Sequence, residues 1–505
     1  RRHYCFSHEG YKSECARIVR ELANRYGNNP YVAAWQTDNE YGCHDTTVSY
    51  SAAARRSFQL WLRKQFSNNG NAGDIAALNA AWGNVFWSMD YDDFDQIDLP
   101  NLTVTEPNPA HSLAFRCFSS DQVVAFNKLQ VDIIRSLSDA PIAHNYMGGV
   151  TDFDHFKVGQ DLEISSWDSY PLGFLEDRVG QDDSHVTHFA RQGDPDYQAF
   201  HHDLYRAVGR GRWWVMEQQP GPVNWAPFNP VPMPGMVRLW TWEAFAHGAE
   251  AVCYFRWRQA PMAQEQMHAG LLRPDSVEAP AFAEARHVAQ EIASAPDVSI
   301  KQAPVAIMFD YNADFAWNIQ PHGRGLTYLS LIFDIYRALR RMGLSIDILS
   351  PETRDFDGYK LVVMSGIMHV PEDLKQALSQ SDARVIWGPR SAARDAHMSL
   401  PDGLPPQLVD FDIKIIRVES LRPVLGLNWN MGASVAIIAK TLKSMTQKLW
   451  KQPKTGHVSL WLGGSKFTLL VGWIKTDGCS SCANNAKTWV WISMICLLDY
   501  DAGTR

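Results

Sequence analysis

The sequence has few of the features that mark secreted, membrane-spanning or nucleic-acid-binding chains. Its eight cysteines are scattered along the chain and do not show the spacing of the disulfide frameworks that stabilise small secreted domains. The longest apolar run, 489–498, has about half the length needed to cross a bilayer. The net charge of −8 offers no basic surface for nucleic acid. We therefore expect a reduced, cytoplasmic protein without membrane or nucleic-acid partners.

Length and composition describe a globular chain of several domains. The 505 residues are 46% hydrophobic and 20% charged, and such a length exceeds what a single core usually organises. Over residues 1–297, short apolar segments alternate with helical patterns, which favours parallel β/α repeats. A complete barrel of such repeats has eight strands. Five strands are expected here: 31–36, 142–147, 164–169, 212–217 and 251–257.

Two glutamates stand at the carboxyl ends of strand-like segments. Glu40 follows the segment 31–36 beside Asn39, and Glu217 ends the segment 212–217. The strand ends of a parallel barrel converge on one mouth, so the two carboxyls are expected to meet. Such a pair suits glycoside cleavage, because one carboxyl protonates the leaving oxygen while the other attacks the anomeric carbon.

Each of these assignments has a structural alternative. A solvated strand end is the better interpretation of an isolated Asn-Glu pair, but the neighbours of Glu40 favour a site: Trp35, Tyr41 and His44. Three tryptophans are candidate platforms for a sugar ring, with core packing as the alternative for each: Trp167, Trp225 and Trp257. Asp168 and Tyr170 stand at the end of another expected strand, 164–169, and are candidate ligand contacts, with a turn cap as the alternative for Asp168.

Three segments resemble glycoside hydrolase family 42, the β-galactosidases: residues 1–5 (RRHYC), 38–46 (DNEYGCHDT) and 216–221 (MEQQPG). The resemblance runs from residue 1 to about residue 415 in the family's order and spacing. It implies a retaining mechanism in which Glu40 is the acid/base and Glu217 is the nucleophile. It also implies that five residues hold the sugar: Arg1, Asn39, Trp225, Glu265 and His268.

The resemblance gives the expected strands a place in the family's fold. It implies that they are strands four to eight of a (β/α)8 TIM barrel, with Arg1 just past strand three. Roughly the first hundred residues of a complete barrel are then expected to be absent. The partial catalytic barrel would occupy residues 1–297. Because a partial barrel exposes strand edges, poor folding is expected unless the rest is supplied.

A composition break near residue 297 predicts a second domain, 298–415. Its expected elements form the pattern of a small doubly wound sheet: strands 305–309, 345–349, 361–365 and 384–387, and helices 327–342 and 371–379. This segment contains neither a dinucleotide fingerprint nor a P-loop, so no cofactor is expected. The resemblance implies an amidotransferase-like scaffold that mediates trimer contacts, and hence a homotrimer.

Residues 416–505 are predicted to form a small β-domain with an atypical sequence. No acidic residue occurs between Glu419 and Asp477, whereas seven lysines accumulate there. The segment 488–492 lacks the alternation of a half-buried strand. A reading-frame error in part of this tail is our hypothesis for the difference.

No metal is expected either. Cys479 and Cys482 have metal-ligand spacing, but no second pair lies at a suitable distance. Some members of the resembled family carry a four-cysteine zinc site beside the acid/base strand. Cys5 matches the first ligand, and the other three positions hold Ser49, Ser51 and Ala54. One thiolate is too few for a structural zinc ion.

The sequence therefore predicts a retaining exo-β-galactosidase that acts on a galactoside or oligosaccharide. Three alternatives stay open: a carbohydrate-binding or inactive fragment of such an enzyme, an interaction protein that uses its aromatic loops, and a related exo-glycosidase such as an α-L-arabinopyranosidase or β-glucosidase. Discrimination between sugars depends on a few hydrogen bonds whose geometry a sequence does not give.

Overall fold

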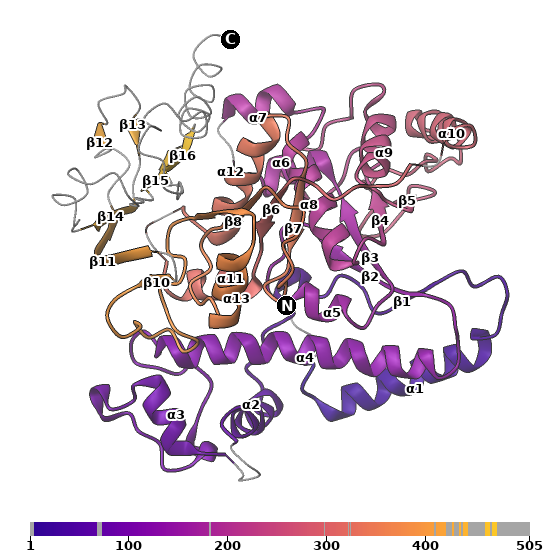
Figure 1. The fold of residues 1–505 in the computed structure, drawn as a ribbon. Helices are drawn as coiled ribbons and strands as arrows, with labels where there is room; N and C mark the ends of the chain where they lie inside the picture. The colour runs from indigo at the N-terminus through magenta and orange to yellow at the C-terminus, as the bar shows by residue number, and fades with distance from the viewer. Residues whose placement is uncertain are drawn as a thin grey trace. The chain divides into compact units, whose positions relative to one another are not determined.

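The computed structural model divides the chain into two compact units, residues 1–301 and 302–505. It describes residues 5–67, 73–180, 183–296, 298–321, 323, 325–408 and 411–420, together with the short segments 427–428, 434–435, 438–442, 460–464 and 467–471. Figure 1 shows the elements of both units. Within the described residues, no helix combines the length and apolar character needed to cross a bilayer.

A parallel sheet of five strands organises the first unit. The strands are β1 (Trp35–Gln36), β2 (Ile142–Met147), β3 (Ile164–Ser169), β4 (Trp213–Gln218) and β5 (Ala251–Tyr254). Their order in the sheet is their order in the chain, and every neighbouring pair is parallel. This succession is that of a TIM-barrel-like α/β fold, in which each strand is added beside the one before it.

Polar residues inside two of these strands are the first sign of a site. All six residues of β2 and all six of β3 are buried, as expected for a sheet covered on both faces. Apolar side chains do not fill these strands completely. His144 and Asn145 in β2 and Asp168 in β3 are each 0% exposed. Buried polar side chains require hydrogen-bonding partners, so they constrain the geometry around them.

The expected first strand is wrong in its first four residues. We predict a buried strand over 31–36, but only Trp35–Gln36 pair with β2, and Tyr31 is 93% exposed. The physical reason is a turn at Asn29, whose side-chain oxygen accepts a hydrogen bond from the Tyr31 amide at 2.9 Å. The Asn29 carbonyl also accepts from the Val32 amide at 3.0 Å. An Asx turn of this kind competes with strand pairing.

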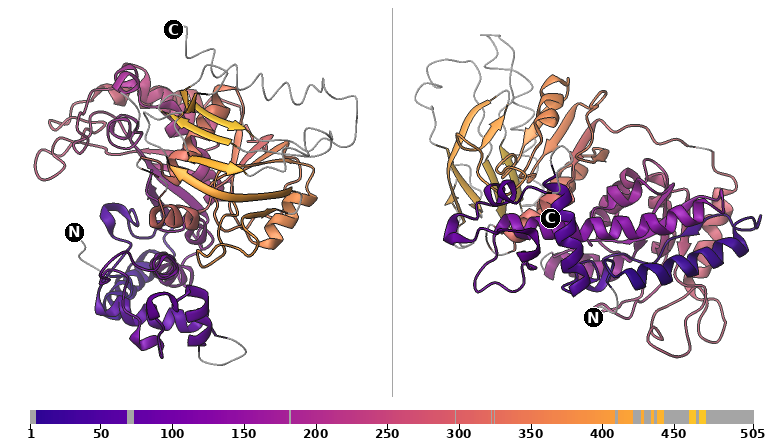
Figure 2. Two further views of the ribbon diagram at one scale, coloured as in Figure 1. Left: turned by 90° about the vertical axis from the view of Figure 1, so that its left-hand side faces the viewer. Right: turned by 90° about the horizontal axis from the view of Figure 1, so that it is seen from below.

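Helices surround the sheet of the first unit. They are α1 (Glu9–Tyr26), α2 (Ala52–Gln65), α3 (Ile75–Trp82), α4 (Pro109–Arg135), α5 (His155–Gly159), α6 (Pro171–Asp177), α7 (Asp183–Phe189), α8 (Pro195–Val208), α9 (Met236–Ala246) and α10 (Pro280–Ile292). Three short 3-10 helices lie in loops: Cys43–Asp45, Phe86–Ser88 and Phe94–Gln96. α8 packs against β3. α1 lies along α4, and the right-hand view of Figure 2 shows the indigo helix beside the long violet one.

The sequence pattern predicts a helix over 118–137, but α4 begins earlier, at Pro109. Asn108 caps it by accepting a hydrogen bond from the Ala110 amide at 2.9 Å, and Pro109 occupies the first turn. Both are standard start signals, but they lie at the end of an aromatic-rich loop that masks the helical periodicity. The added turns pack Phe115 and His111 against α2.

The second unit is built on a separate parallel sheet. Its strands, β6 (Val305–Met308), β7 (Ile346–Leu349), β8 (Leu361–Met364) and β9 (Arg384–Trp387), lie in the order β7-β6-β8-β9. The order reverses at β6, as in doubly wound sheets. Its helices are α11 (Tyr311–Ile319), α12 (Tyr328–Arg341) and α13 (Glu372–Gln380). The strand predictions are confirmed to within one residue at each end. α11, which Asp310 caps, is absent from the prediction.

Antiparallel strands follow β9 in the sequence. β10 (Pro406–Leu408), β11 (Phe411–Ser420) and β14 (Ile438–Leu442) form one sheet, β12 (Leu427–Asn428) pairs with β13 (Ser434–Val435), and β15 (Leu460–Gly464) pairs with β16 (Phe467–Val471). The predicted boundary between residues 415 and 416 falls inside β11. A separate third domain stays a prediction. Cys479, Cys482 and the segment 488–492 lie outside the described residues.

The aromatic core between α2 and α4 provides a test of this packing. Phe58 is 0% exposed and packs against Phe115 and Phe118, with ring centroids 5.3 Å away in each case. We expect Phe58→Ala to lower the free energy of unfolding by about 3–5 kcal/mol, because it leaves a cavity that helices cannot close. Denaturant unfolding measures this change. Leu60→Ala is the matched control on the same helix, since Leu60 is 66% exposed; equal losses would contradict the assigned packing.

Candidate active site

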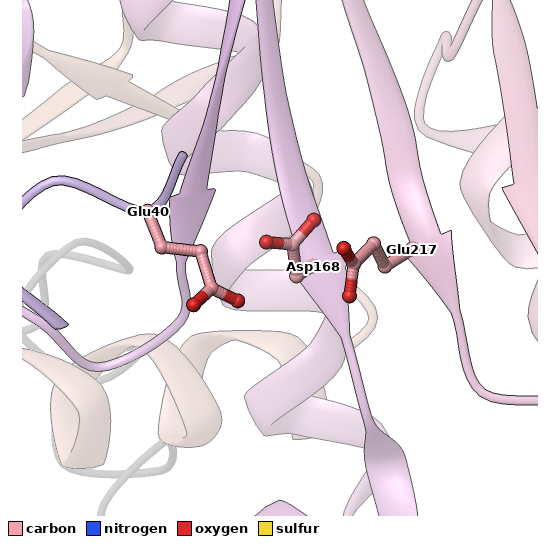
Figure 3. Close-up of side chains that lie close together, drawn as sticks. All are labelled: Glu40, Asp168 and Glu217. Atoms are coloured by element: carbon pink, nitrogen blue, oxygen red, sulfur yellow. The ribbon is translucent and has the colours of Figure 1, made fainter. Parts of the chain in front are cut away.

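Three carboxyl groups converge at the carboxyl end of the first unit's sheet. One oxygen atom from each of Glu40, Asp168 and Glu217 lies within 4.8 Å of the corresponding atoms of the other two. Figure 3 shows Asp168 between the two glutamates, with the three side chains coming from neighbouring parts of the sheet. The predicted meeting of Glu40 with Glu217 is thus what the fold produces, although 177 residues separate them in the sequence (217 − 40 = 177).

The backbone that carries Glu40 is strained. Glu40 and Asp38 both adopt left-handed conformations, with φ of 45° and 47°. Such conformations are costly for residues other than glycine and persist where surrounding contacts impose them. The contact at Glu40 is a hydrogen bond from its amide to Asn145 Oδ1 at 3.3 Å. The chain therefore turns sharply after β1, and this turn directs the Glu40 side chain toward Asp168 and Glu217.

Asn145 of β2 is the residue that organises this turn. Its Oδ1 also accepts a hydrogen bond from Gln36 Nε2 at 2.9 Å. Its Nδ2 donates to Asn39 Oδ1 at 3.0 Å and to Asp168 Oδ2 at 2.9 Å. A side-chain amide has two donor hydrogens and two acceptor lone pairs, so every one of them is used. Asn145 thereby fixes Asn39, Glu40 and Asp168 relative to one another.

A bulge in β4 places Glu217 beside Asp168. Trp167 of β3 pairs with Val215, but the next residue, Asp168, pairs with Glu217, so β4 carries one additional residue at Met216. The pairing of β4 with β5 shifts at the same point. A bulge of this kind re-aims a side chain without ending the strand. The two acidic residues consequently lie at adjacent positions of the sheet.

Burial and charge act together on the two carboxyls nearest the sheet. The pKa of Glu217 is raised to about 7, chiefly by burial and also by the negative charge of Glu40. The Tyr170 hydroxyl opposes this shift by donating a hydrogen bond to Glu217, and Arg256 opposes it through its positive charge. The pKa of Asp168 is raised well above its usual range, first by complete burial and then by Glu217 and Glu40.

Aromatic rings form one wall of the site around Tyr170. The Trp225 and His268 rings both contact the Tyr170 ring edge-on, with centroids 5.8 Å and 5.5 Å away. Trp225 is 39% exposed, so part of its indole stays available to a ligand, whereas His268 is buried. The fold therefore brings together five of the candidate site residues: Asn39, Glu40, Glu217, Trp225 and His268.

The other predicted sugar-binding residues lie differently. Glu265 is exposed and forms an ion pair with Arg256, which in turn acts on Glu217. Glu265 therefore belongs to the site through Arg256. Arg1 lies outside the described residues.

The two other candidate tryptophans differ from each other. Trp167 is a core residue with 0% exposure, and its indole N–H donates to His202 Nδ1 at 3.2 Å, so core packing applies to it. Trp257 packs against Phe282 of α10 but is 64% exposed. A role for Trp257 as a sugar platform stays a prediction.

Asn145 and Arg256 are the site residues that sequence reasoning missed. A signal for Asn145 exists: His144 and Asn145 are polar residues in the middle of an expected strand, and such residues require partners when they are buried. The sequence gives no comparable signal for Arg256, because its role depends on two residues distant in the chain.

The positions of the family's zinc ligands do not suit a metal here. Cys5 Sγ lies 3.3 Å from Ser51 Oγ, so these positions do come together. Ser51 Oγ, however, caps α2 by accepting a hydrogen bond from the Ala54 amide at 3.1 Å. Ala54 has no ligand atom, and a neutral hydroxyl is a poor substitute for thiolate. The cysteines within the described part of the chain form no disulfide.

Comparison with known proteins gives the evolutionary context of this site. A family model described as "Beta-galactosidase", for glycoside hydrolase family 42, matches residues 1–295. The chain belongs to glycoside hydrolase family 42. The resemblance seen in the sequence motifs is thereby confirmed. A second model of the same family, described as "Beta-galactosidase trimerisation domain", matches residues 303–447.

Individual members of family 42 are similar over most of the chain. It is 51% identical over 428 residues to a β-galactosidase of Thermus thermophilus, which covers 84% of this chain and 65% of that protein. It is 43% identical over 415 residues to β-galactosidase Bga of Halorubrum lacusprofundi, covering 81% and 58%. The chain thus spans 65% and 58% of the length of these two relatives.

A solved structure supports the fold. The β-galactosidase from the psychrophilic Marinomonas ef1 superposes on this chain with a TM-score of 0.84 at 43% identity. The match covers 99% of this chain and 76% of that one. Together with the parallel sheet of the first unit, it supports an α/β, TIM-barrel-like fold.

The contact between Gly173 and Trp225 provides a test of the aromatic wall. A Cβ atom on Gly173 of α6 would lie 2.4 Å from the Trp225 indole, too close to be accommodated without movement. We expect Gly173→Ala to displace this ring and to lower the free energy of unfolding by about 1–3 kcal/mol. Fluorine NMR of fluorotryptophan-labelled protein reports the displacement. Asp177→Ala, an exposed position of the same helix, is the control; an unmoved Trp225 signal in Gly173→Ala contradicts the packing.

Proposed function

We propose that the protein to which this chain belongs is a retaining exo-β-galactosidase that hydrolyses terminal, non-reducing β-D-galactose residues by double displacement. The observation that carries this proposal is the approach of Glu40 to Glu217 to within 4.8 Å at the ends of two strands of one sheet. Retaining glycosidases place their two carboxyls about 5 Å apart, whereas inverting enzymes leave a wider gap for a water molecule. Membership of family 42 and the names of its members support the same reaction.

In the first step, Glu217 attacks the anomeric carbon while Glu40 protonates the departing oxygen. This step requires charge on Glu217 and a proton on Glu40. The hydrogen bond from Tyr170 favours charge on Glu217, and Arg256 acts in the same direction. Both contacts oppose the burial that raises the pKa of Glu217.

In the second step, Glu40 acts as the base. It takes a proton from a water molecule, which attacks the galactosyl–Glu217 ester and releases galactose with its original anomeric configuration. Asn39 is proposed to hold the sugar 2-hydroxyl, a contact that strengthens in the transition state. The hydrogen bond from Asn145 to Asn39 Oδ1 leaves the Asn39 amide hydrogens directed away from Asn145 and suited to this donation.

The remaining parts of the proposal concern assembly. The five strands β1–β5 are proposed to be strands four to eight of a barrel, supported by the parallel order of the sheet and by the length of the relatives. A homotrimer is proposed from the match to the trimerisation domain. Trp225, Glu265, His268 and Arg1 are proposed to hold the galactose. A cytoplasmic location stays a prediction from the cysteine pattern.

Azide distinguishes the roles of the two glutamates. We expect Glu217→Ala to lose at least about a thousandfold in turnover of a nitrophenyl β-galactoside, because no covalent intermediate forms. Azide should then attack the substrate directly and give α-galactosyl azide. Glu40→Ala should retain its nucleophile, so azide should intercept the intermediate and give β-galactosyl azide. NMR of the products identifies the anomer.

The paired variants make the outcome decisive. Exchange of the two anomers between the variants would reverse the assigned roles. Unchanged turnover in both variants would contradict the proposed reaction. A panel of nitrophenyl β-glucosides and α-L-arabinopyranosides, assayed with the same chain, tests whether galactose is the preferred sugar.

A further inference from the structure

The third carboxyl of the cluster, Asp168, has no part in the double displacement. It is 0% exposed and lies between Glu40 and Glu217, as Figure 3 shows. Its Oδ2 accepts the hydrogen bond from Asn145 Nδ2 at 2.9 Å. Its Oδ1 is buried and has no hydrogen-bond donor among the described residues. A buried carboxylate oxygen without a donor is unfavourable, whereas a carboxylic acid can use that oxygen as a donor itself.

The surroundings of Asp168 favour the neutral acid. Among the described residues, the charged groups that act on it are Glu217 from β4 and Glu40 from the turn after β1, and both are acidic. Tyr170, just after the end of β3, and Tyr205 of α8 also lie close enough to interact with it electrostatically. Arg256 acts on Glu217, and the side-chain amide of Asn145 opposes the raised pKa of Asp168. Burial beside two acids, with no cation acting on it in the described part of the chain, strongly disfavours a third negative charge.

We propose that Asp168 is a neutral carboxylic acid that donates its proton as a hydrogen bond to Glu40 and so acts as a positioning residue. Its role in turnover rests on the proposed function, but its protonation does not. Asp168 keeps its proton throughout the cycle, so no bond is formed or broken at this residue. The two reacting carboxyls then have separate neutral donors: the Tyr170 hydroxyl serves Glu217, and the Asp168 acid serves Glu40.

A neutral donor at this position suits both states of Glu40. When Glu40 carries a proton, its second oxygen accepts from Asp168, and its own O–H points to the leaving group. When Glu40 has lost that proton, the same hydrogen bond stabilises the carboxylate that will act as base. An ionised Asp168 would instead repel that carboxylate.

Asparagine is the matched replacement, because it reproduces the neutral acid. In Asp168→Asn, the new Oδ1 can accept from Asn145 and the new Nδ2 can donate to Glu40. We expect turnover within about tenfold of the wild type for this variant, and a loss of about 10- to 100-fold beyond that for Asp168→Ala, which has no donor. The alkaline limb of the pH–rate profile should shift to higher pH in Asp168→Asn, because an ionisable group has been removed. A residue with a merely structural role would leave that limb unchanged.

Infrared spectroscopy tests the protonation without turnover. The whole chain, grown with carboxyl-¹³C aspartate, should show a protonated aspartic acid band at pH 7 that disappears in Asp168→Asn and persists in Asp177→Asn, an exposed control. Absence of any difference between wild type and Asp168→Asn overturns the proposal, whatever the activity. A neutral Asp168 in a chain without turnover would instead count against the proposed function alone.

Stability provides a second measurement. Because the pKa of Asp168 is higher in the folded than in the unfolded state, folding takes up a proton, and this favourable contribution is lost as pH rises above about 4 toward the folded pKa. Relative to Asp168→Asn, the wild type should therefore become progressively less stable over that range. A parallel pH dependence for both proteins overturns the proposal. Stabilisation of the wild type by Ca²⁺ or Mg²⁺ would also overturn it, since three ionised carboxylates would then form a cation site.

Discussion

The constraint on which the first unit depends is the crowding of three carboxyl groups at one end of its sheet. Negative charges that are this close together and poorly hydrated repel each other strongly. Without compensating contacts, the backbone would shift and move the carboxyl groups apart. The compensation comes from neutral hydrogen-bond donors: Tyr170 at Glu217, and Asn145 at Asp168. The bulge in β4 and the left-handed turn at Glu40 work in the opposite direction, since both bring the acids together. The strained backbone and the repulsion between carboxyls lower stability at this end of the sheet, but they come with an arrangement in which the acids can act together.

The sequence predicts regular elements well where burial alone determines them. Strands 142–147, 164–169 and the four strands of the second sheet are short segments bounded by turns, and their predicted limits agree with the structure to within one residue. Prediction fails where a single side chain overrides the pattern. Asn29 turns the chain before β1, and Asn108 starts α4 inside an aromatic-rich loop. These are local polar contacts, and hydrophobic periodicity carries no information about them.

The same distinction applies to the site. Glu40 and Glu217 are identified by family motifs and by their strand ends, so their meeting is predictable from the sequence. The importance of Asn145 depends on four partners that only the folded chain brings together. Asp168 is ambiguous in the sequence because a carboxyl at a strand end equally suits a ligand or a turn. Its distinctive property, complete burial next to two acids, is a property of the tertiary structure alone.

The brevity of β1 has a consequence for how the two glutamates are held. β1 contributes two residues to the sheet and, within the described chain, pairs with β2 alone, whereas β4 pairs on both sides over most of its length. Local opening is least costly where backbone pairing is sparse. Glu217 is thus held by strand pairing on both sides, whereas Glu40 follows only two paired residues and its amide is held by the Asn145 side chain. Loss of that single side-chain amide would therefore release the acid/base while leaving the backbone of the nucleophile in place.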